Sequence, residues 1–229
     1  MSTQSNVAMI ASLVSEPSRA AILTALLDGR FHTASELAHM AGIKPQTTSF
    51  HLAKMTEAQV VTVEKQGRHR YYGIQDPEVA QVMESLLSIA PPVPIKSFKQ
   101  ASENEAIRLA RTCYDHVAGH LGVQIMSFFM QKGILSEDQD GLHITQQGEI
   151  FFADFQINLK NTRQKRRSFS HKCLDWSERR HHLAGALGSA LLDRLFELHW
   201  VEHLPTTRAI RITAEGKRGF KEVFSIEIG

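Results

Sequence analysis

Two groups of side chains in this sequence have the types and spacing to do chemistry. The first group is polar and basic and comprises Lys44, Gln46, Thr47, Thr48, Ser49, His51, Lys54, Lys65, Gln66, Arg68, His69 and Arg70. Amides and hydroxyls can hydrogen-bond to base edges, and lysine and arginine neutralise phosphates. Five lysines and arginines stand against two glutamates between residues 44 and 72, while the whole chain has a formal net charge of only +2. A local positive charge of this kind predicts contact with double-stranded DNA at one face.

The second group combines thiols, imidazoles and carboxylates: Cys113, Asp115, His116, His120, Cys173, Asp175 and His182. On a helix, the spacing of Cys113, His116 and His120 would place their side chains on one face. Such ligands suit Zn²⁺ or a similar divalent metal, and two half-sites could close one four-ligand site. Three other interpretations stay open. The cysteines could form a redox pair, they could be small core residues, and the two aspartates could simply pair with Arg111 or Arg179.

The first group lies on a predicted helix, tight turn, helix and β-hairpin. Ser35–Ala38 begins the first helix, Gly42 provides the turn, and Pro45 starts a second helix that continues to Met55. The hairpin spans residues 60–72 and has a basic tip. We expect the polar residues of the second helix to enter the major groove. The opposite side should anchor to the core through Phe50, Leu52, Ala53 and Met55.

Residues ~5–90 resemble the ArsR-type winged helix-turn-helix repressors of bacteria. The marks that carry the resemblance are Glu36-Leu37-Ala38, Thr47-x-Ser49-x-His51-Leu52 and Gly67-Arg68-x-Arg70-Tyr71-Tyr72. The resemblance implies a homodimer on a palindromic operator, released when an effector is sensed. Two metal sites known in that family are missing from this sequence. One uses cysteines on the helix before the recognition helix, and residues 35–40 hold no cysteine; the other uses Asp/His pairs on the last helix of the domain, and residues 77–89 hold no histidine.

Apolar residues at helical spacing predict flanking helices at residues 7–14, 18–27 and 77–89. These helices could form the homodimer interface, or they could cover the core of a monomer. Pro91, Pro92 and Pro94 then predict a semi-rigid linker. We therefore expect a DNA-binding and dimerisation domain at residues 1–90, a linker at 91–100 and a sensor domain at 101–229.

The sensor domain contains an internal repeat, with copies at residues ~101–160 and ~161–229. The segment from Cys113 to Ile125 returns from Cys173 to Leu191 with an insertion, and Ile144-Thr145-x-x-Gly148 returns as Ile212-Thr213-x-x-Gly216. A capping box of Ser102 and Glu105 predicts a long helix ahead of the repeat. Each copy then reads as helix, strand, turn, strand and helix, which is a winged-helix-like outline. The predicted core residues are Val117, Leu121, Ile125 and Phe128 in the first copy and Leu183, Leu187, Leu191 and Leu195 in the second.

Composition narrows the class of protein further. The chain has 229 residues, of which 42% are hydrophobic and 22% charged, as is usual for a globular protein. No apolar run approaches the ~20 residues of a transmembrane helix, the start lacks the pattern of a secretory signal, and two cysteines make no disulfide framework. We expect a cytoplasmic protein with reduced thiols and no membrane partner.

These features together predict a mainly α fold with small β-hairpins (α+β) and an effector-responsive repressor. The effector could be a metal, a small molecule or a redox signal, and no cofactor is required. An architectural or protein-recruiting module, whose DNA binding no ligand switches, is the alternative. Nucleotide fingerprints, nucleophile elbows and His-Glu-x-x-His motifs are absent from the sequence, so we do not expect an enzyme.

Overall fold

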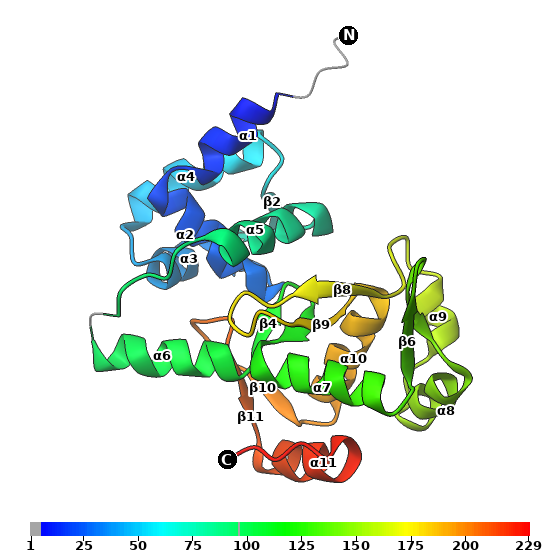
Figure 1. Ribbon diagram of the computed structural model, residues 1–229. Helices are drawn as coiled ribbons and strands as arrows, with labels where there is room; N and C mark the ends of the chain where they lie inside the picture. The colour runs from blue at the N-terminus through cyan, green and yellow to red at the C-terminus, as the bar shows by residue number, and fades with distance from the viewer. Residues whose placement is uncertain (1–5, 96) are drawn as a thin grey trace. The chain divides into compact units, whose positions relative to one another are not determined.

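The computed structural model describes residues 6–95 and 97–229, and it divides into two compact units. The first unit runs to Leu86 and includes Pro205–Thr207, and the second comprises Leu87–Leu204 and Arg208–Gly229. Both are mainly helical with small antiparallel hairpins (Figure 1). The predicted fold class is therefore confirmed.

The first unit is a winged helix-turn-helix. Its elements are α1 (Val7–Val14), α2 (Pro17–Ala25), the 3-10 turn η1 (Leu26–Asp28), β1 (His32–Thr33), α3 (Ala34–Ala41), α4 (Pro45–Glu57), β2 (Thr62–Gln66), β3 (His69–Gly73) and α5 (Pro77–Ile89), whose last turn belongs to the second unit. The three strands form one sheet in the order β1-β3-β2. Helices α2, α3 and α4 pack against one another around Leu23, Leu37 and Leu52, which are fully buried.

Local sequence signals define the turn between α3 and α4. Thr33 caps α3 and forms a capping box with Glu36, so that two unpaired amides of the first turn gain partners. The helix ends at Gly42, whose φ of 66° is a left-handed conformation that favours glycine. Pro45 then occupies the first turn of α4, where its missing N–H costs no hydrogen bond.

The second unit begins with α6 (Phe98–Leu109), which starts inside the predicted linker. The Ser97 hydroxyl accepts a hydrogen bond from the Gln100 amide at 3.2 Å and caps this helix. The predicted capping box of Ser102 and Glu105 was wrong, because both residues lie within α6. Residue 96 of the linker lies outside the described residues.

The same order of elements then occurs twice in the second unit. The first series is β4 (Arg111–Cys113), β5 (His116–Ala118), α7 (Gly119–Gln131), β6 (Leu135–Asp138), β7 (Gly141–Ile144) and α8 (Gln146–Asp154). After the short helix α9 (Leu159–Arg163) comes the second series: β8 (His171–Leu174), β9 (His181–Ala184), α10 (Gly185–Glu197), β10 (Val201–His203), β11 (Ile210–Ile212) and α11 (Ala214–Phe224).

The first hairpin of each series packs against the other series. Helix α7 of the first series packs against β9 of the second, α10 packs against β5, and β5 lies beside β9. All but one of the predicted core residues of both copies are buried; Phe128 is half-buried against the same core. An aromatic cluster that includes Phe129, Phe152 and Phe224 fills the region between the helices.

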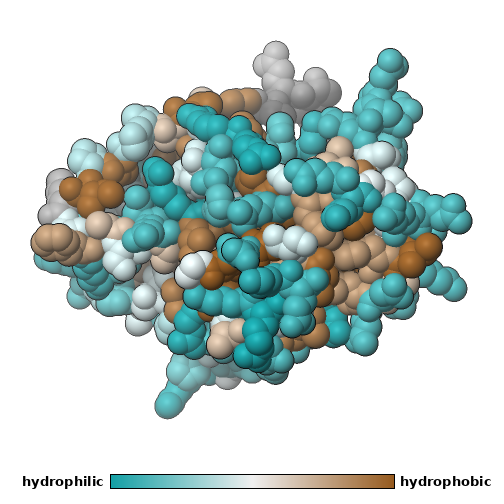
Figure 2. All heavy atoms as spheres, turned by 60° about the horizontal axis from the view of Figure 1, so that its bottom comes forward, coloured by the Kyte–Doolittle hydropathy of each residue, from teal (hydrophilic) through white to brown (hydrophobic). Residues whose placement is uncertain are grey.

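The molecular surface is mixed in character. Figure 2 shows one face, on which hydrophobic areas lie between hydrophilic side chains. Among the described residues, no single helix is both long enough and apolar enough to cross a membrane, although the bent pair Val7–Val14 and Pro17–Asp28 passes that test on length and composition.

Candidate nucleic-acid interface and metal centre

One side of α4 is exposed and polar. Gln46, Thr47, Ser49 and Lys54 are exposed, and Lys44 stands exposed just ahead of the helix. The Ser49 hydroxyl donates to the Pro45 carbonyl oxygen at 3.1 Å, which holds it close to the helix surface. These side chains have the reach and the chemistry to contact base edges and phosphates.

Two residues predicted to contact DNA lie on the other side of α4. Thr48 is fully buried, and its hydroxyl donates to the Lys44 carbonyl oxygen at 3.1 Å. His51 is 7% exposed, and its Nε2 lies 3.4 Å from a Glu16 carboxylate oxygen. Both belong to the buried face with Leu52 and Met55, so neither can reach DNA as the helix now stands.

Two residues predicted to anchor α4 in the core are instead exposed. Phe50 is 57% exposed, and Ala53 is exposed as well. The Lys54 ammonium lies 4.5 Å from the centre of the Phe50 ring, a cation–π contact at the surface. An aromatic residue in this position adds an apolar contact to the polar face, and the sequence prediction misplaced Phe50 and Ala53 while it placed Leu52 and Met55 correctly in the core.

The β2–β3 hairpin, which we call the wing, carries the basic residues of the first group. Lys65, Gln66, Arg68, His69 and Arg70 are all exposed at or near its tip. Gln66 pairs with His69, and Gly67 makes the turn with a φ of 60°. A groove of about 580 Å³ lies between α4 and the wing, and Ser49, Lys65, Arg68 and Arg70 are among the residues that line it.

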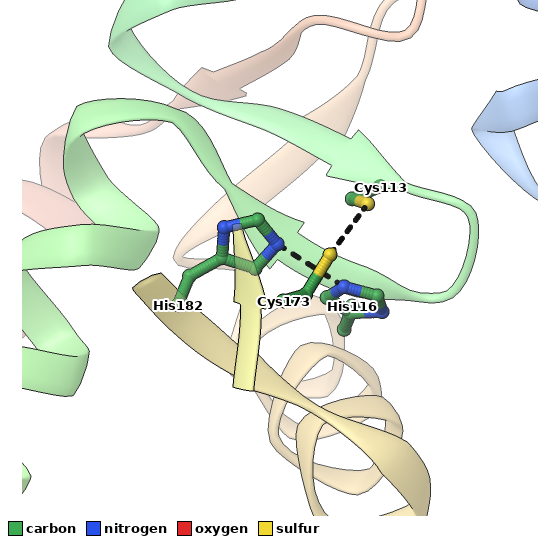
Figure 3. A group of neighbouring side chains, drawn as sticks. All are labelled: Cys113, His116, Cys173 and His182. Carbon is green, nitrogen blue, oxygen red and sulfur yellow. Dashed lines mark hydrogen bonds between the residues drawn. The ribbon is translucent and has the colours of Figure 1, made fainter. Parts of the chain in front are cut away.

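Four of the seven predicted metal ligands meet in the second unit. The potential ligand atoms of Cys113, His116, Cys173 and His182 all lie within 4.8 Å of one another. The two Sγ atoms are 3.8 Å apart, too far for a disulfide bond, and the two Nε2 atoms are 3.2 Å apart. Figure 3 shows the four side chains converging from the two hairpins. Three of them are buried and Cys173 is half-buried.

The register of the two hairpins explains this convergence. Cys113 pairs directly with His116 across β4–β5, and Cys173 pairs with His182 across β8–β9. Directly paired residues of antiparallel strands project from the same face of the hairpin. Because β5 lies beside β9, the two cysteine–histidine pairs face each other.

Helical glycines allow the two histidines to approach the opposite helices. A Cβ added at Gly122 would lie 3.4 Å from the His182 Cβ and 2.5 Å from the Val117 carbonyl oxygen. A Cβ added at Gly188 would lie 3.2 Å from the His116 Cβ. The packing of α7 against β9 and of α10 against β5 therefore depends on glycine at these positions.

The two predicted aspartates lie behind the histidines. Asp115 Oδ1 is 3.3 Å from His116 Nδ1, and Asp175 Oδ2 is 3.3 Å from His182 Nδ1. Asp115 also pairs with Arg167, and Asp175 with the fully buried Arg111. The pairing of Asp175 with Arg111, one of the alternatives drawn from the sequence, is confirmed, yet it accompanies the contact with His182.

The electrostatics of the cluster favour charged groups despite burial. A hydrogen bond with the Cys113 thiol, followed by those with His116 and His182, lowers the pKa of Cys173 against the effect of burial. Burial alone would lower the pKa of His116, but its bonds with Asp115 and Cys173 raise this pKa to about 9. Burial likewise opposes ionisation of Asp115 and Asp175, but His116 and Arg167 lower the pKa of the first, and His182 and Arg111 that of the second.

His120 does not belong to the cluster. Its side chain is 51% exposed and its Nδ1 lies 2.9 Å from Glu178 Oε2. The prediction that Cys113, His116 and His120 share a helical face was wrong, because the first two lie on paired strands and helix α7 begins only at Gly119. Tyr114, with a φ of 59°, lies in the tight turn between Cys113 and His116.

Comparison with known proteins places the chain in a family. A family model described as a helix-turn-helix domain matches residues 14–64. The chain is 50% identical over 223 residues to the uncharacterized HTH-type transcriptional regulator YdfF of Bacillus subtilis strain 168, and the match covers 97% of this chain and 99% of that protein.

Two solved structures show partial similarity. The transcriptional repressor BigR from Xylella fastidiosa is 24% identical, with a TM-score of 0.35 over 38% of this chain and 88% of that one. The cadmium metal-sensor CMTR from Mycobacterium tuberculosis is 25% identical, with a TM-score of 0.33 over 40% of this chain and 99% of that one. From the full-length match and the helix-turn-helix domain, this chain belongs to the HTH-type transcriptional regulators.

Proposed function

We propose that this protein is a cytoplasmic repressor that binds a palindromic operator as a homodimer and releases it in response to an effector. The observation that carries the proposal is the continuous exposed surface of α4 and the wing, which joins a polar helix face to a basic hairpin. A helix flanked by a basic wing suits a major groove and the phosphates beside it.

Each part of this surface has a proposed role. Gln46 can bond the edge of an adenine, and the Thr47 methyl and the Phe50 ring can pack against thymine methyl groups. Lys44 and Lys54 neutralise phosphates beside α4. In the wing, Lys65, Gln66, Arg68, His69 and Arg70 follow the backbone or enter the adjacent minor groove, where a narrow width favours arginine.

Exposed apolar residues support the proposed homodimer. On α1, Val7 is 72% exposed, and on α5, Val82 is 53% exposed. Such side chains at helical spacing are stabilised when a second copy covers them. A two-fold dimer would present two recognition helices about one DNA turn apart, which matches a palindrome. Val82→Glu should yield monomers in sedimentation velocity, whereas a variant that stays dimeric would exclude this interface.

Fluorescence anisotropy with DNA from upstream of the protein's own gene tests the proposed DNA contact. Affinity should fall steeply with salt, because each phosphate contact releases counterions. Arg70→Ala should reduce the slope of log K against log salt by about 1, while the exposed Arg218→Ala on α11 serves as the matched control. A flat salt dependence, or equal losses in both variants, would reject the proposed interface.

The effector class that we propose is a divalent metal, bound in the second unit. Two thiols and two imidazoles gathered within 4.8 Å support this choice over an organic ligand. DNA contact itself requires no cofactor in this proposal, so the metal acts only as the signal.

A further inference from the structure

We infer that Cys113, His116, Cys173 and His182 form one closed, four-coordinate site for Zn²⁺ or a chemically similar cation such as Cd²⁺. The inference has two parts. That the site binds metal stands by itself, and that metal binding regulates DNA contact rests on the proposed function.

Two distances within the cluster match the edges of a tetrahedron around Zn²⁺. With Zn–S bonds of about 2.3 Å and Zn–N bonds of about 2.0 Å, the edges of a regular tetrahedron are about 3.8 Å between sulfurs and about 3.3 Å between nitrogens. The Sγ atoms of Cys113 and Cys173 lie 3.8 Å apart, and the Nε2 atoms of His116 and His182 lie 3.2 Å apart. Both like-atom edges are therefore already at the spacing that one central ion requires.

The orientation of the imidazoles points to the same conclusion. In each ring Nδ1 faces an aspartate, Asp115 for His116 and Asp175 for His182, at 3.3 Å. The Asp115 carboxylate hydrogen-bonds to Nδ1 of His116, which favours Nε2 of that ring as the metal ligand. The Asp175 carboxylate lies close to Nδ1 of His182 but makes no aligned hydrogen bond with it. The two Nε2 atoms share a hydrogen bond at 3.2 Å, and an ion bound to both nitrogens would take the place of that proton. Asp115 is thus a positioning residue for the nitrogen ligand of His116.

The donor set selects the class of metal. Two thiolates and two imidazoles suit borderline and soft cations, whereas Mg²⁺ and Ca²⁺ prefer oxygen ligands. Four protein ligands also complete a tetrahedron and leave no position for a water molecule or substrate. The site therefore suits a structural or regulatory ion rather than a catalytic one.

The four ligands come from two different hairpins, so a bound ion would connect those hairpins. One cysteine and one histidine come from the β4–β5 hairpin, and the other pair comes from β8–β9. A bound ion would cross-link the two hairpins at the place where β5 lies beside β9. Binding would therefore stiffen the unit that follows the DNA-binding domain, which is the kind of change that can shift a regulator between two states.

Metal titration of the full-length protein tests the site. Protein stripped with chelator and kept reduced with a phosphine would be titrated with Co²⁺, which reports thiolate ligation and tetrahedral geometry in its absorption spectrum, and then with Zn²⁺. We expect one ion per chain, thiolate-to-cobalt charge-transfer bands and displacement of Co²⁺ by Zn²⁺. An octahedral spectrum, or no binding at micromolar Co²⁺ and Zn²⁺, would overturn the site without any variant having to fold.

Variants then assign the ligands. Cys173→Ser and His116→Ala should each weaken Zn²⁺ binding at least 100-fold in competition with a chromophoric chelator. Asp115→Asn should weaken it about 10-fold to 100-fold, as removal of a partner behind a ligand does. His120→Ala is the matched control and should leave the affinity unchanged, because its imidazole is bound to Glu178 outside the cluster. Equal losses in all variants would overturn the assignment.

The regulatory part is measured separately by operator anisotropy with and without stoichiometric Zn²⁺. We expect at least a tenfold change in DNA affinity that Cys173→Ser abolishes and His120→Ala retains. Tight Zn²⁺ binding with unchanged DNA affinity would leave the metal site standing and overturn its role as effector. Loss of DNA binding under every condition would overturn the proposed function and leave the Co²⁺ and Zn²⁺ result intact.

Discussion

Replacement of Asp175 by asparagine should strongly destabilise the second unit. The carboxylate is fully buried and accepts five hydrogen bonds: from Arg111 Nη2 at 2.9 Å, the Gly119 amide at 2.7 Å, the Ser177 amide at 2.9 Å, the Ser177 hydroxyl at 2.7 Å and the Glu178 amide at 3.1 Å. It thereby joins the β8–β9 hairpin to β4 and to the first residue of α7.

The magnitude follows from which donors lose their partner. Asparagine keeps one carbonyl oxygen, and its NH₂ group replaces either the oxygen that faces Arg111 and Gly119 or the oxygen that faces Ser177 and Glu178. In the first orientation a fully buried guanidinium loses its counter-charge, and removal of one partner of a buried ion pair costs about 3–5 kcal/mol. In the second, at least two amide donors face another donor, at about 1–3 kcal/mol each. We therefore expect a loss of about 3–5 kcal/mol.

Urea denaturation of metal-free Asp175→Asn and wild-type protein would measure this loss. Thermal unfolding of the second unit should shift downward by roughly 10 °C, since about 2–4 °C accompany each kcal/mol in a domain of this size. Glu202→Gln is the control, because its partner Arg211 is 65% exposed and surface pairs contribute less than about 1 kcal/mol. A change below about 1 kcal/mol in Asp175→Asn would refute the structural role given to this carboxylate.

Three further predictions concern other parts of the chain. Phe50→Ala should weaken operator binding severalfold and reduce the preference for thymine at the contacted position, with unchanged thermal stability because the ring is 57% exposed; a stability loss like that of a core residue would contradict this. Asp28, whose pKa is lowered mainly by His32 against the effect of burial, contributes stability that is complete above its ordinary pKa of 3.8 and is lost as the pH falls through the lower folded value. Asp28→Asn should therefore destabilise the first unit by about 3 kcal/mol at pH 7, and in urea titrations the difference from wild type should shrink steadily as the pH falls below 3.8; a pH-independent difference would reject the reasoning. Gly216→Ala should cost more than about 2 kcal/mol, since an added Cβ would lie 2.0 Å from the Trp200 carbonyl oxygen, whereas the exposed Arg218→Ala on the same helix should be neutral in the same denaturation assay.

Local features of the sequence were enough to predict the winged helix-turn-helix. Thr33 with Glu36, Gly42 and Pro45 mark the ends of α3 and the start of α4 through contacts only a few residues long. The wing has its turn at Gly67, between the paired residues Gln66 and His69. Such signals act within one or two turns of chain, so they can be read without knowledge of the tertiary structure.

The buried face of α4 was decided by tertiary packing. Thr48 and Phe50 lie two residues apart, and the sequence favoured the aromatic side chain for the core. The structure buries Thr48 and exposes Phe50, because α2 and α3 pack against the side of α4 that carries Leu52 and Met55. A polar threonine is tolerated there because its hydroxyl donates a hydrogen bond to the carbonyl oxygen of Lys44, the residue that caps the start of the helix.

The proposed metal site shows the same division between sequence and structure. The sequence by itself pointed to the four residues of the cluster and to both aspartates, because thiols, imidazoles and carboxylates recur in the two copies. It could not separate His120 from the ligands, since helical spacing was assumed where a tight turn at Tyr114 places Cys113 and His116 on paired strands. Only the tertiary structure brings together side chains 60 residues apart, because their meeting depends on long-range packing of the two hairpins and not on local propensity.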